Sequence, residues 1–475
     1  MNKSAPPTVG NSTCAALACV ILWAGPPTLS ASDADEIRLL REQISQLDQK
    51  LRILERNQEL KDEAAVAAAK AAPKITASDG RIEIASADGA NSLRLRGLLQ
   101  VDHRWYDAAN RPADTFLLRR ARLGFDGRFN NFLQYAVQAE LAGTVQVLDA
   151  NINAVITPAF QVRIGKFKSP VGLEQLQADP VAFFNERSVA TNLTSGRDVG
   201  LQLHGDVLNK RLNYTLALLN GVPDGGNNVT GSTDFDDHKT VAVRLFTTPF
   251  VNDKDAVLNG LGAGFAISSG DYSTAAGRAA SYRTDGQQTF FTYLTSTATT
   301  ADNVSAAGRG FTYSLQAYFY RGPFGLLAEY VGSSLELQRG TGRVRAACHH
   351  AYNLSVGYVL TGEDSTYRGV TPKTSFNPSA GTWGAFEVVA RVAGVDVDDT
   401  VFSGGAAGRL ADPDVSATKL TAVGLGVNWY LSKSARAGFN FYRNAFDLAP
   451  GASPSATALI GDDETTFISR FQVTF

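Results

Sequence analysis

The sequence predicts a closed transmembrane β-barrel of sixteen antiparallel strands, preceded by a short α-helical coiled coil. Three observations favour this fold class. From residue 92 to the end of the chain, apolar and polar side chains alternate in one segment after another, and a membrane-spanning strand needs about 9 to 11 residues of this pattern. The connections between these segments alternate between short and long, as in outer-membrane barrels. The chain also ends on an aromatic residue, Phe475, that completes an alternating strand.

The composition excludes other classes of protein. The 475 residues include 44 Gly and 1 Met, their formal net charge is −2, and their mean hydropathy is −0.10. No stretch after the N-terminus has 18 apolar residues without a charge, which excludes a membrane protein of many helices. Aromatic and β-branched residues occur throughout the chain, which excludes low-complexity disorder. We expect no nucleic acid as a partner.

Residues 1–31 have the pattern of a secretory signal peptide. An apolar stretch around residues 14–24 follows Lys3 and precedes two prolines and several small residues, so cleavage is expected near residues 31–34. A short buried helix is the alternative. Of the three cysteines, Cys14 and Cys19 lie within the apolar stretch, which leaves only Cys348 in the processed chain. An internal disulfide is then impossible, no cysteine motif has metal-ligand spacing, and we expect an exported protein without a metal or cofactor.

Residues 33–63 are predicted to form a charged helix with one apolar seam. An a/d pattern over three heptads is typical of a coiled coil, and a helix packed on its own domain is the alternative. Isoleucine at a and leucine at d favour a dimer in isolated peptides, although a folded body with its own symmetry could override that preference. Residues 64–91 begin with an alanine-rich tract and are interpreted as a linker. The seam consists of Ile37, Leu40, Ile44, Leu47, Leu51 and Leu54.

From residue 92 the hydrophobic period changes to two. Leu93 and Leu95 alternate with Arg94 and Arg96, for example. A soluble sandwich has the same period, but this length of chain would divide into domains with visible linkers. Short connections follow the even-numbered strands, except for residues 362–381, and an even strand count puts both barrel ends on the periplasmic side, with the coiled coil. The predicted strands are residues 92–106, 115–128, 132–143, 147–157, 160–167, 198–207, 211–220, 238–248, 258–270, 308–320, 323–335, 349–361, 382–394, 417–431, 435–446 and 464–475.

Arginines on the predicted strands indicate a pathway for anions. A charged side chain that faces lipid at mid-bilayer costs about 2–4 kcal/mol, so these arginines are expected inside the barrel or at its rims. Guanidinium groups offer planar forks of donors to oxyanions, and rings of Arg and Lys select anions in pores. Arg119 falls on the opposite face from Arg120 and is expected at a rim or a bulge. Alternation places these residues inward: Arg94, Arg96, Arg120, Arg122, Arg128, Arg163, Arg244, Arg391, Arg436 and Arg470.

Four segments resemble the phosphate-selective porins O and P. Residues 116–127, FLLRRARLGFDG, are similar to the second strand of that family, and residues 163–174, RIGKFKSPVGLE, are similar to the segment before its long third loop. Motifs within residues 185–205 resemble the return of that loop into the barrel, and residues 382–387 resemble a further family segment. The resemblance covers most of residues 92–475.

The resemblance implies a homotrimer of sixteen-stranded barrels, each with its third loop, about residues 168–197, folded inward as a constriction. It also implies that phosphate or polyphosphate moves along an arginine ladder, which corresponds here to Arg119, Arg120 and Arg122. Lysine is scarce, with 13 Lys among the 44 basic residues, so we do not expect the central lysine cluster of phosphate-selective members. The expected constriction residues are Lys166, Lys168, Arg187 and Arg197.

The expected function is passive diffusion of small anions, phosphate among them, through a lipid-embedded barrel in the bacterial outer membrane. The alternatives are a general or differently selective porin, in which acids such as Asp126 and Glu140 neutralise the arginines, and an adhesin or structural barrel. No enzyme is expected, because none of the five histidines lies in a nucleophile motif. His349 and His350 are expected in a solvated outer loop. The terminal Phe475 resembles the signal that barrel assembly machinery recognises.

Overall fold

The structure, a computed structural model, describes residues 31–78, 81–107, 112–222, 224–227, 237–272, 279–295, 302–453 and 463–475. The chain divides into two units, residues 1–72 and residues 73–475. The predicted signal peptide, apart from its last residue, lies outside the described residues. No helix in the described ranges is long and apolar enough to cross a membrane.

The described part of the first unit is a single helix, α1 (Ala31–Ala71). It is longer than the predicted residues 33–63, because the alanine-rich tract that was interpreted as a linker is helical, and alanine has the highest helix propensity. Pro73 follows the end of the helix, where its missing N–H cannot continue the hydrogen-bond ladder. The seam residues Ile44, Leu47 and Leu54 are each more than 60% exposed in the single chain.

The rest of the predicted linker contains two strands. β1 (Lys74–Ser78) and β2 (Arg81–Ala85) form an antiparallel hairpin, and β2 pairs with the first residues of the barrel, Ile82 opposite Leu95. The prediction of a linker over residues 64–91 was therefore wrong. Ile82-Glu83-Ile84 alternates like the strands that follow, and this short alternation is the signal that was overlooked.

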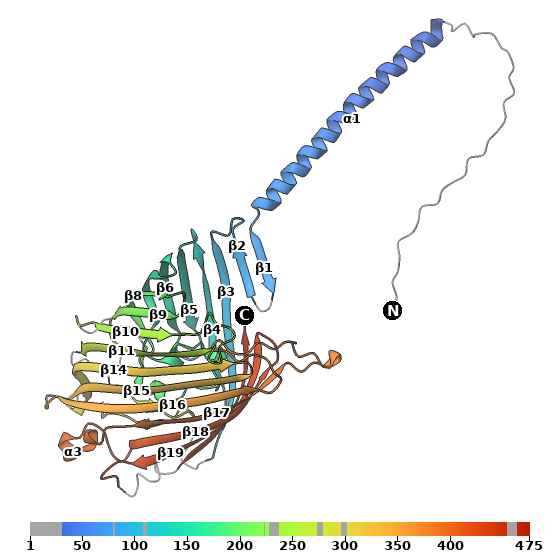
Figure 1. Cartoon of the computed structure of the whole chain (residues 1–475). Coiled ribbons are helices and arrows are strands. Elements are labelled where there is room, and N and C mark those ends of the chain that lie inside the picture. Colours follow the sequence, from blue (N-terminus) through green and yellow to red (C-terminus); the bar gives the residue numbers. More distant parts are fainter. Residues whose placement is uncertain are drawn as a thin grey trace. The chain divides into compact units, whose positions relative to one another are not determined.

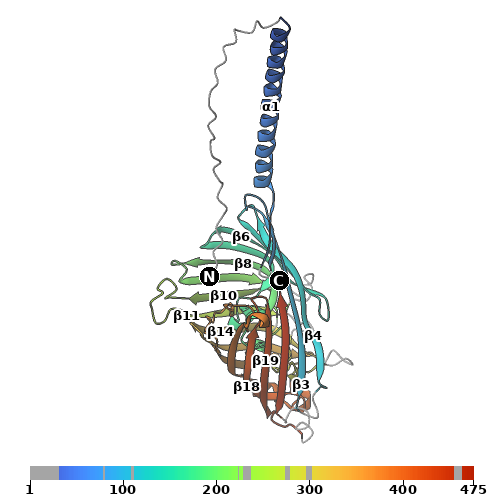
Figure 2. The same cartoon turned by 90° about the vertical axis from the view of Figure 1, so that its right-hand side faces the viewer.

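Among the described residues, sixteen antiparallel strands close into a barrel (Figure 1). β3 pairs with β20, with Val101 opposite Phe471, and Figure 2 shows these two ends of the barrel side by side. The predicted strand number and closure are confirmed. The strands are β3 (Ser92–Tyr106), β4 (Thr115–Phe129), β5 (Leu133–Glu140), β6 (Gln146–Thr157), β7 (Phe160–Lys168), β8 (Arg197–Val207), β9 (Leu212–Leu219), β10 (Thr240–Thr247), β11 (Leu261–Tyr272), β14 (Val304–Arg321), β15 (Phe324–Arg339), β16 (Arg345–Val359), β17 (Ala385–Asp396), β18 (Ala417–Tyr430), β19 (Ala435–Leu448) and β20 (Glu464–Thr474).

Side chains alternate between the outside and the lumen of the barrel. On β3, Leu99 and Val101 are 44% and 39% exposed, whereas Gln100 and Asp102 between them are fully buried. The apolar outer face suits lipid, and the polar inner face suits a water-filled lumen. Three strands extend by four residues beyond their predicted ends on the long-loop side: β14 from Val304, β15 to Arg339 and β16 from Arg345.

The short turns lie at one end of the barrel and the long loops at the other. Asn130 and Asn131, with φ of 50° and 63°, form the turn between β4 and β5, a conformation that asparagine tolerates better than most residues. Two connections at the short-turn end are longer: residues 248–260 between β10 and β11 and, as predicted, the connection between β16 and β17, which contains the short helix η4 (Pro378–Ala380).

A hydrophobic core fills part of the lumen of the barrel. Two loops enter the barrel from the long-loop side and pack against its inner wall. One of them carries η2 (Val189–Leu193), and the other carries β12 (Tyr282–Arg283) and β13 (Thr289–Phe291). Their buried side chains join residues of the later strands and of the connection that holds η5 (Asp399–Phe402) and α3 (Gly405–Gly408). The lumen is therefore occupied on the side of β14 to β18.

Candidate functional site

The loop between β7 and β8, residues 169–196, crosses the interior of the barrel. It contains α2 (Leu173–Leu176) and η1 (Asp179–Val181) in addition to η2. The backbone N–H of Leu173 donates to Glu329 on β15 at 2.7 Å, and that of Asn185 donates to Asn440 on β19 at 2.8 Å. The loop is thus held by the barrel wall opposite to β7 and β8, the two strands that it connects.

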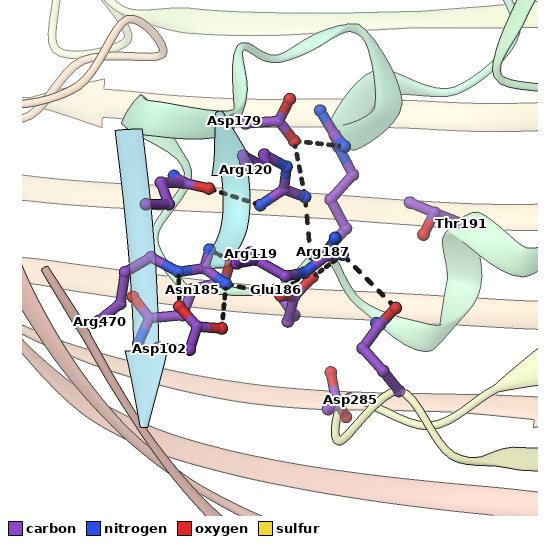
Figure 3. A network of polar contacts seen from close by, with 12 residues as sticks. Asp102, Arg119, Arg120, Asp179, Asn185, Glu186, Arg187, Thr191, Asp285 and Arg470 are labelled. Atoms are coloured by element: carbon purple, nitrogen blue, oxygen red, sulfur yellow. Dashed lines mark hydrogen bonds and ion pairs between the residues drawn. The ribbon is translucent and has the colours of Figure 1, made fainter. Parts of the chain in front are cut away.

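Glu186, in this loop, lies within a cluster of arginines (Figure 3). Its carboxylate accepts hydrogen bonds from Arg104 at 2.9 Å, from Arg119 at 2.6 Å and from Arg470 at 2.6 Å. Asp102 accepts from both Arg104 and Arg470, the latter at 2.6 Å. These arginines, except the partly exposed Arg119, are buried, so the carboxylates of the protein occupy their donors.

A β-bulge explains how two consecutive arginines both reach the lumen. Gln100 pairs with Arg120 and Val101 pairs with Leu118, so Arg119 is the extra residue on β4. A bulge of this kind re-aims the side chain of the inserted residue. Arg119 therefore lies at a bulge, one of the two positions predicted for it, but its guanidinium is directed at Glu186.

Asp179 is the centre of a second group of ion pairs. Its carboxylate oxygens lie 3.2 Å from Arg120, 2.5 Å from Arg122 and 2.7 Å from Arg187. Arg122 also donates to Glu140 at 2.7 Å. The family-derived ladder residues are therefore brought together by the structure, but with acids between them.

The charges around these two loop carboxylates outweigh the effect of burial. Burial by itself would raise the pKa of Glu186, but Arg119, Arg470, Arg120 and Arg104 hold that pKa well below its usual range. Asp179 is in the same position: burial raises its pKa, and the nearby basic groups, led by Arg120 and Arg187, lower it well below the usual range. Both carboxylates are ionised, and they neutralise the arginines that face them.

Two further predicted arginines hold the loop to the wall. Arg391 donates to Glu174 at 2.8 Å, lies 3.2 Å from Asp285, and stacks over the ring of Phe184. Arg436 donates to the backbone carbonyl of Ala182 at 2.7 Å. Both side chains are buried, so they fix the loop in place and are not presented to the lumen.

The predicted constriction residues have different environments. Lys168 donates to the carbonyl oxygens of Gln175 and Gln177 at 2.8 and 2.7 Å, so its ammonium group holds α2. Arg197 forms a bidentate pair with Asp149 at 3.1 and 3.2 Å. Lys166 is buried in β7.

Open space remains on the side of β3 to β10. A cavity of about 830 Å³ lies between the loop and this wall, and a second of about 400 Å³ lies beside it, toward the short-turn end of β4 to β6. Five residues line both cavities, so the two are adjacent: Arg94, Arg96, Ala136, Asn151 and Arg163. The basic residues that line the larger cavity are Arg94, Arg96, Arg122, Arg163, Lys168, Arg197, Arg244 and Lys433, and the acidic ones are Asp149 and Asp179.

The remaining predicted arginines belong to this open side. Arg94 and Arg96 share Asp126, at 2.5 and 3.5 Å, and both stay partly exposed. Arg128 lines the smaller cavity. Arg244 donates to the side-chain oxygen of Gln316 at 2.9 Å and lies over the ring of Phe246.

Sequence reasoning missed four residues of these two groups of ion pairs, namely Asp102, Arg104, Asp179 and Glu186. Arg104 lies an even number of residues after Arg94 and Arg96 on the same strand, so alternation places all three on the same face. This signal was sufficient to find it. Asp179 and Glu186 lie in the loop, where no periodicity exists to indicate which way a side chain points. The expectation of a solvated outer loop was wrong for His349, which is buried within β16 and bonded to the hydroxyl of Tyr293 at 2.6 Å.

Comparisons with known proteins agree with the fold. The family of phosphate-selective porins O and P matches residues 93–475. Porin O of Pseudomonas aeruginosa is 24% identical over 429 residues, which are 83% of this chain and 91% of that protein. The solved structure of OmpT, an outer membrane protein of Vibrio cholerae, is similar with a TM-score of 0.51 at 12% identity, over 85% of this chain and 100% of that one. The outer membrane channel DcaP of Acinetobacter baumannii has a TM-score of 0.50 at 10% identity, over 81% and 98% of the two chains. The chain is thus an outer-membrane porin that belongs to the phosphate-selective porin O and P family.

Proposed function

We propose that this porin conducts small anions through the larger cavity, along the wall formed by β3 to β10. The observation that carries the proposal is the composition of the cavity lining, in which eight basic side chains face two acidic ones. Both acids are already paired, Asp149 with Arg197 and Asp179 with Arg122. The surplus of positive charge in a confined lumen attracts anions and repels cations.

The test is the zero-current potential of the full-length protein in a planar bilayer across a tenfold KCl gradient. The expected sign is that of a chloride-preferring channel. A potential near zero would favour the alternative, a general porin, and a potential of cation-preferring sign would overturn the proposal.

We propose phosphate and polyphosphate among the transported anions. Arg94 and Arg96 line the larger cavity and stay partly exposed, and a guanidinium fork matches two oxygens of a phosphate. The matching family is described as phosphate-selective porins O and P, and the relative at 24% identity is Porin O, which supports the same solute here. Inorganic phosphate is expected to block the chloride current, and sulfate at equal concentration is the control for charge. Equal block by the two anions would show that phosphate is not preferred.

We propose that the barrel is a channel and has no enzymatic role. Three acids of the lumen, Glu186, Asp179 and Asp102, are bonded to arginines. Carboxylates held in this way are ionised and occupied, which makes them poor general acids or nucleophiles. Hydrolase assays on ester and peptide substrates are expected to show no turnover above that of the empty membrane.

We propose that three copies assemble as a homotrimer. β5, β9 and β10 have eight residues each, fewer than the 9 to 11 that a strand needs to cross the bilayer. A neighbouring protomer placed against these short strands would cover the wall where it is lowest. The exposed apolar seam of α1 supports the same assembly, since a coiled coil of the three copies would bury it. Native mass measurement in detergent tests the number of copies.

We propose that residues 33–63 lie in the periplasm as the coiled coil and that Phe475 serves recognition by the barrel assembly machinery. The even number of strands supports the first statement, because both ends of the barrel then lie on the same side as the short turns. Deletion of residues 33–63 is expected to leave a barrel that inserts and conducts. Loss of insertion in this variant would show that the helix is needed for assembly.

A further inference from the structure

We propose that the lumenal wall of β6 to β10 carries a binding subsite for hydroxylated organic anions, sugar acids or sugar phosphates, with Arg163 as the anchor of the anionic group. This inference rests on the proposed anion channel and specifies a class of solute for it. It concerns a surface that is separate from the arginine cluster around Glu186.

Arg163 lies where the two cavities meet, since it lines both of them. Its Nε is buried and has no hydrogen-bond partner among the described residues, and none of the described carboxylates forms an ion pair with it. Asp149 is the carboxylate whose charge acts on Arg163, and it already accepts a hydrogen bond from Arg197. The buried Nε itself is out of reach of a solute, but the Arg163 side chain lines both cavities, so its charge is available to an anion there.

Neutral polar side chains surround this arginine. The strand register puts Asn153 on β6 and Gln202 on β8 directly opposite Arg163. Side chains at directly opposed positions have Cβ atoms about 5 Å apart. Arg163 is therefore flanked on both sides by carboxamides, and the next charge in its row is Arg128, three strands away on β4.

A second polar row runs beside the first. Gln161 on β7 is opposite His204 on β8, His204 is opposite Thr215 on β9, and Thr215 is opposite Arg244 on β10. His204, Thr215 and Arg244 line the larger cavity together with Gln202. Asn153 is fully engaged, with its amide donating to Gln134 and Gln161 and its oxygen bonded to His204, so it fixes the orientation of this row.

The chemistry of these groups selects the class of solute. An inorganic phosphate oxygen accepts hydrogen bonds and would be bound best by several converging cations. Carboxamides, threonine and histidine both donate and accept, which matches the hydroxyl groups of a sugar. One free guanidinium beside such a row fits a molecule with a single anionic group and several hydroxyls. The cavity of about 830 Å³ has the size of pockets that hold small organic ligands.

The experiment measures block of the chloride current of the full-length protein in planar bilayers. The probes are gluconate and glucose 6-phosphate, with hexanoate as an anion without hydroxyls and glucose as a polyol without charge. Gluconate and glucose 6-phosphate are expected to block at concentrations at least tenfold lower than hexanoate, and glucose is expected not to block. The tighter of the two sugar probes identifies carboxylate or phosphate as the preferred anionic group.

Two variants assign the effect to this wall. Arg163→Gln is expected to raise the blocking concentration of both sugar anions at least tenfold. Gln202→Leu keeps every charge and is expected to weaken gluconate block without changing hexanoate block. The matched control is Arg309→Gln, because Arg309 is 71% exposed and lies outside both cavities.

The outcomes separate this inference from the proposed function. A wild-type channel that prefers cations would overturn the anion channel itself. A channel that prefers anions but is blocked equally by gluconate and hexanoate would overturn only the subsite. Unchanged gluconate block in both Arg163→Gln and Gln202→Leu would also overturn the subsite, and the second variant gives this answer even where the first fails to fold.

Discussion

Arg470, on the last strand of the barrel, donates to Glu186, in the loop that follows β7, with 2.6 Å between Nη2 and Oε1. The strand that closes the barrel therefore also holds the loop that crosses it. This pair belongs to a cluster in which carboxylates of the protein bind the arginines of one side of the lumen. On the opposite side, Arg94, Arg96 and Arg163 line the open cavity, and we infer that this division decides where anions pass.

Glu186→Gln is expected to destabilise the folded barrel. The change leaves Arg104, Arg119 and Arg470 without the carboxylate that they share, and breaking a buried ion pair in this way costs about 3–5 kcal/mol. The loop should also loosen, which increases fluctuations of the open-channel current. Thermal unfolding in detergent and single-channel noise are the measurements. Glu336→Gln is the control, since Glu336 accepts an exposed bond from the backbone of Arg309. A melting temperature equal to that of the wild type would contradict the role of Glu186.

Asp126→Asn is expected to strengthen the preference for anions. Asp126 pairs with Arg94 and Arg96 in the smaller cavity, so its neutralisation releases two guanidinium groups to the pathway. The pairs are partly exposed, and the free energy of unfolding should change by less than about 1 kcal/mol. The zero-current potential in a KCl gradient measures the effect, with Asp271→Asn as a control outside both cavities. A shift toward cations would exclude this part of the lumen from the pathway.

Lys168→Met is expected to weaken the loop more than it changes selectivity. The ammonium group donates to three consecutive carbonyls, those of Gln175, Leu176 and Gln177. Loss of these charge-assisted bonds should lower the free energy of unfolding by at least about 2 kcal/mol. Seven other basic residues of the larger cavity remain, so the anion preference should persist. Lys373→Met, which removes an exposed bond to one carbonyl, is the control. A reversed selectivity without loss of stability would restore Lys168 as a constriction residue.

Asp285 predicts a pH dependence of stability. Burial raises the pKa of its carboxyl to about 7; Arg391 opposes this shift, and Glu174 and Glu464 add to it. Because the folded-state value lies above the ordinary 3.8, the folded barrel binds the extra proton between the two values. Its contribution to stability is complete below the ordinary value and is lost as the pH rises through about 7.

The measurement is chemical unfolding of the wild type and Asp285→Asn at pH 5 and pH 9. The wild type should lose stability between these values, by at most about 1.4 kcal/mol per pH unit from this group. The variant should lose less. It should keep part of the dependence, because burial also raises the pKa of Asp224 to about 7. Equal losses in the two proteins would show that Asp285 does not titrate in this range.

Gly97→Ala is expected to impair closure of the barrel. A Cβ at this position would overlap the ring of Phe475, whose backbone accepts a hydrogen bond from the N–H of Gly97 at 2.7 Å. The ring must move, and the terminal strand should pair less well with β3. Phe475→Ala in the same chain should recover part of the loss, since it empties the space that the new methyl group needs. Heat-dependent gel mobility of the four proteins measures closure, and equal damage in single and double variants would contradict the contact.

The sequence by itself determined the barrel. Lipid outside and water inside impose a period of two on every strand, so the number of strands and the pairing of β3 with β20 follow from a local pattern. The same pattern was sufficient to place Arg94, Arg96 and Arg163 on the lumenal face. It indicated a rim or a bulge at Arg119, where the structure has a bulge. It failed at residues 74–85, where two strands of five residues each are too short to stand out from a linker.

The tertiary structure decided which arginines are available to a solute. Arg470 and Glu186 lie 284 residues apart in the chain, and the side-chain directions of a loop have no period from which to predict them. Only the folded loop shows that Glu186 and Asp179 neutralise the ladder of Arg119, Arg120 and Arg122, whereas the donor of Arg163 stays without a partner among the described residues. Alternation fixes the face of a strand to which a charge belongs. The partner of that charge depends on which segments the closed barrel brings across its interior.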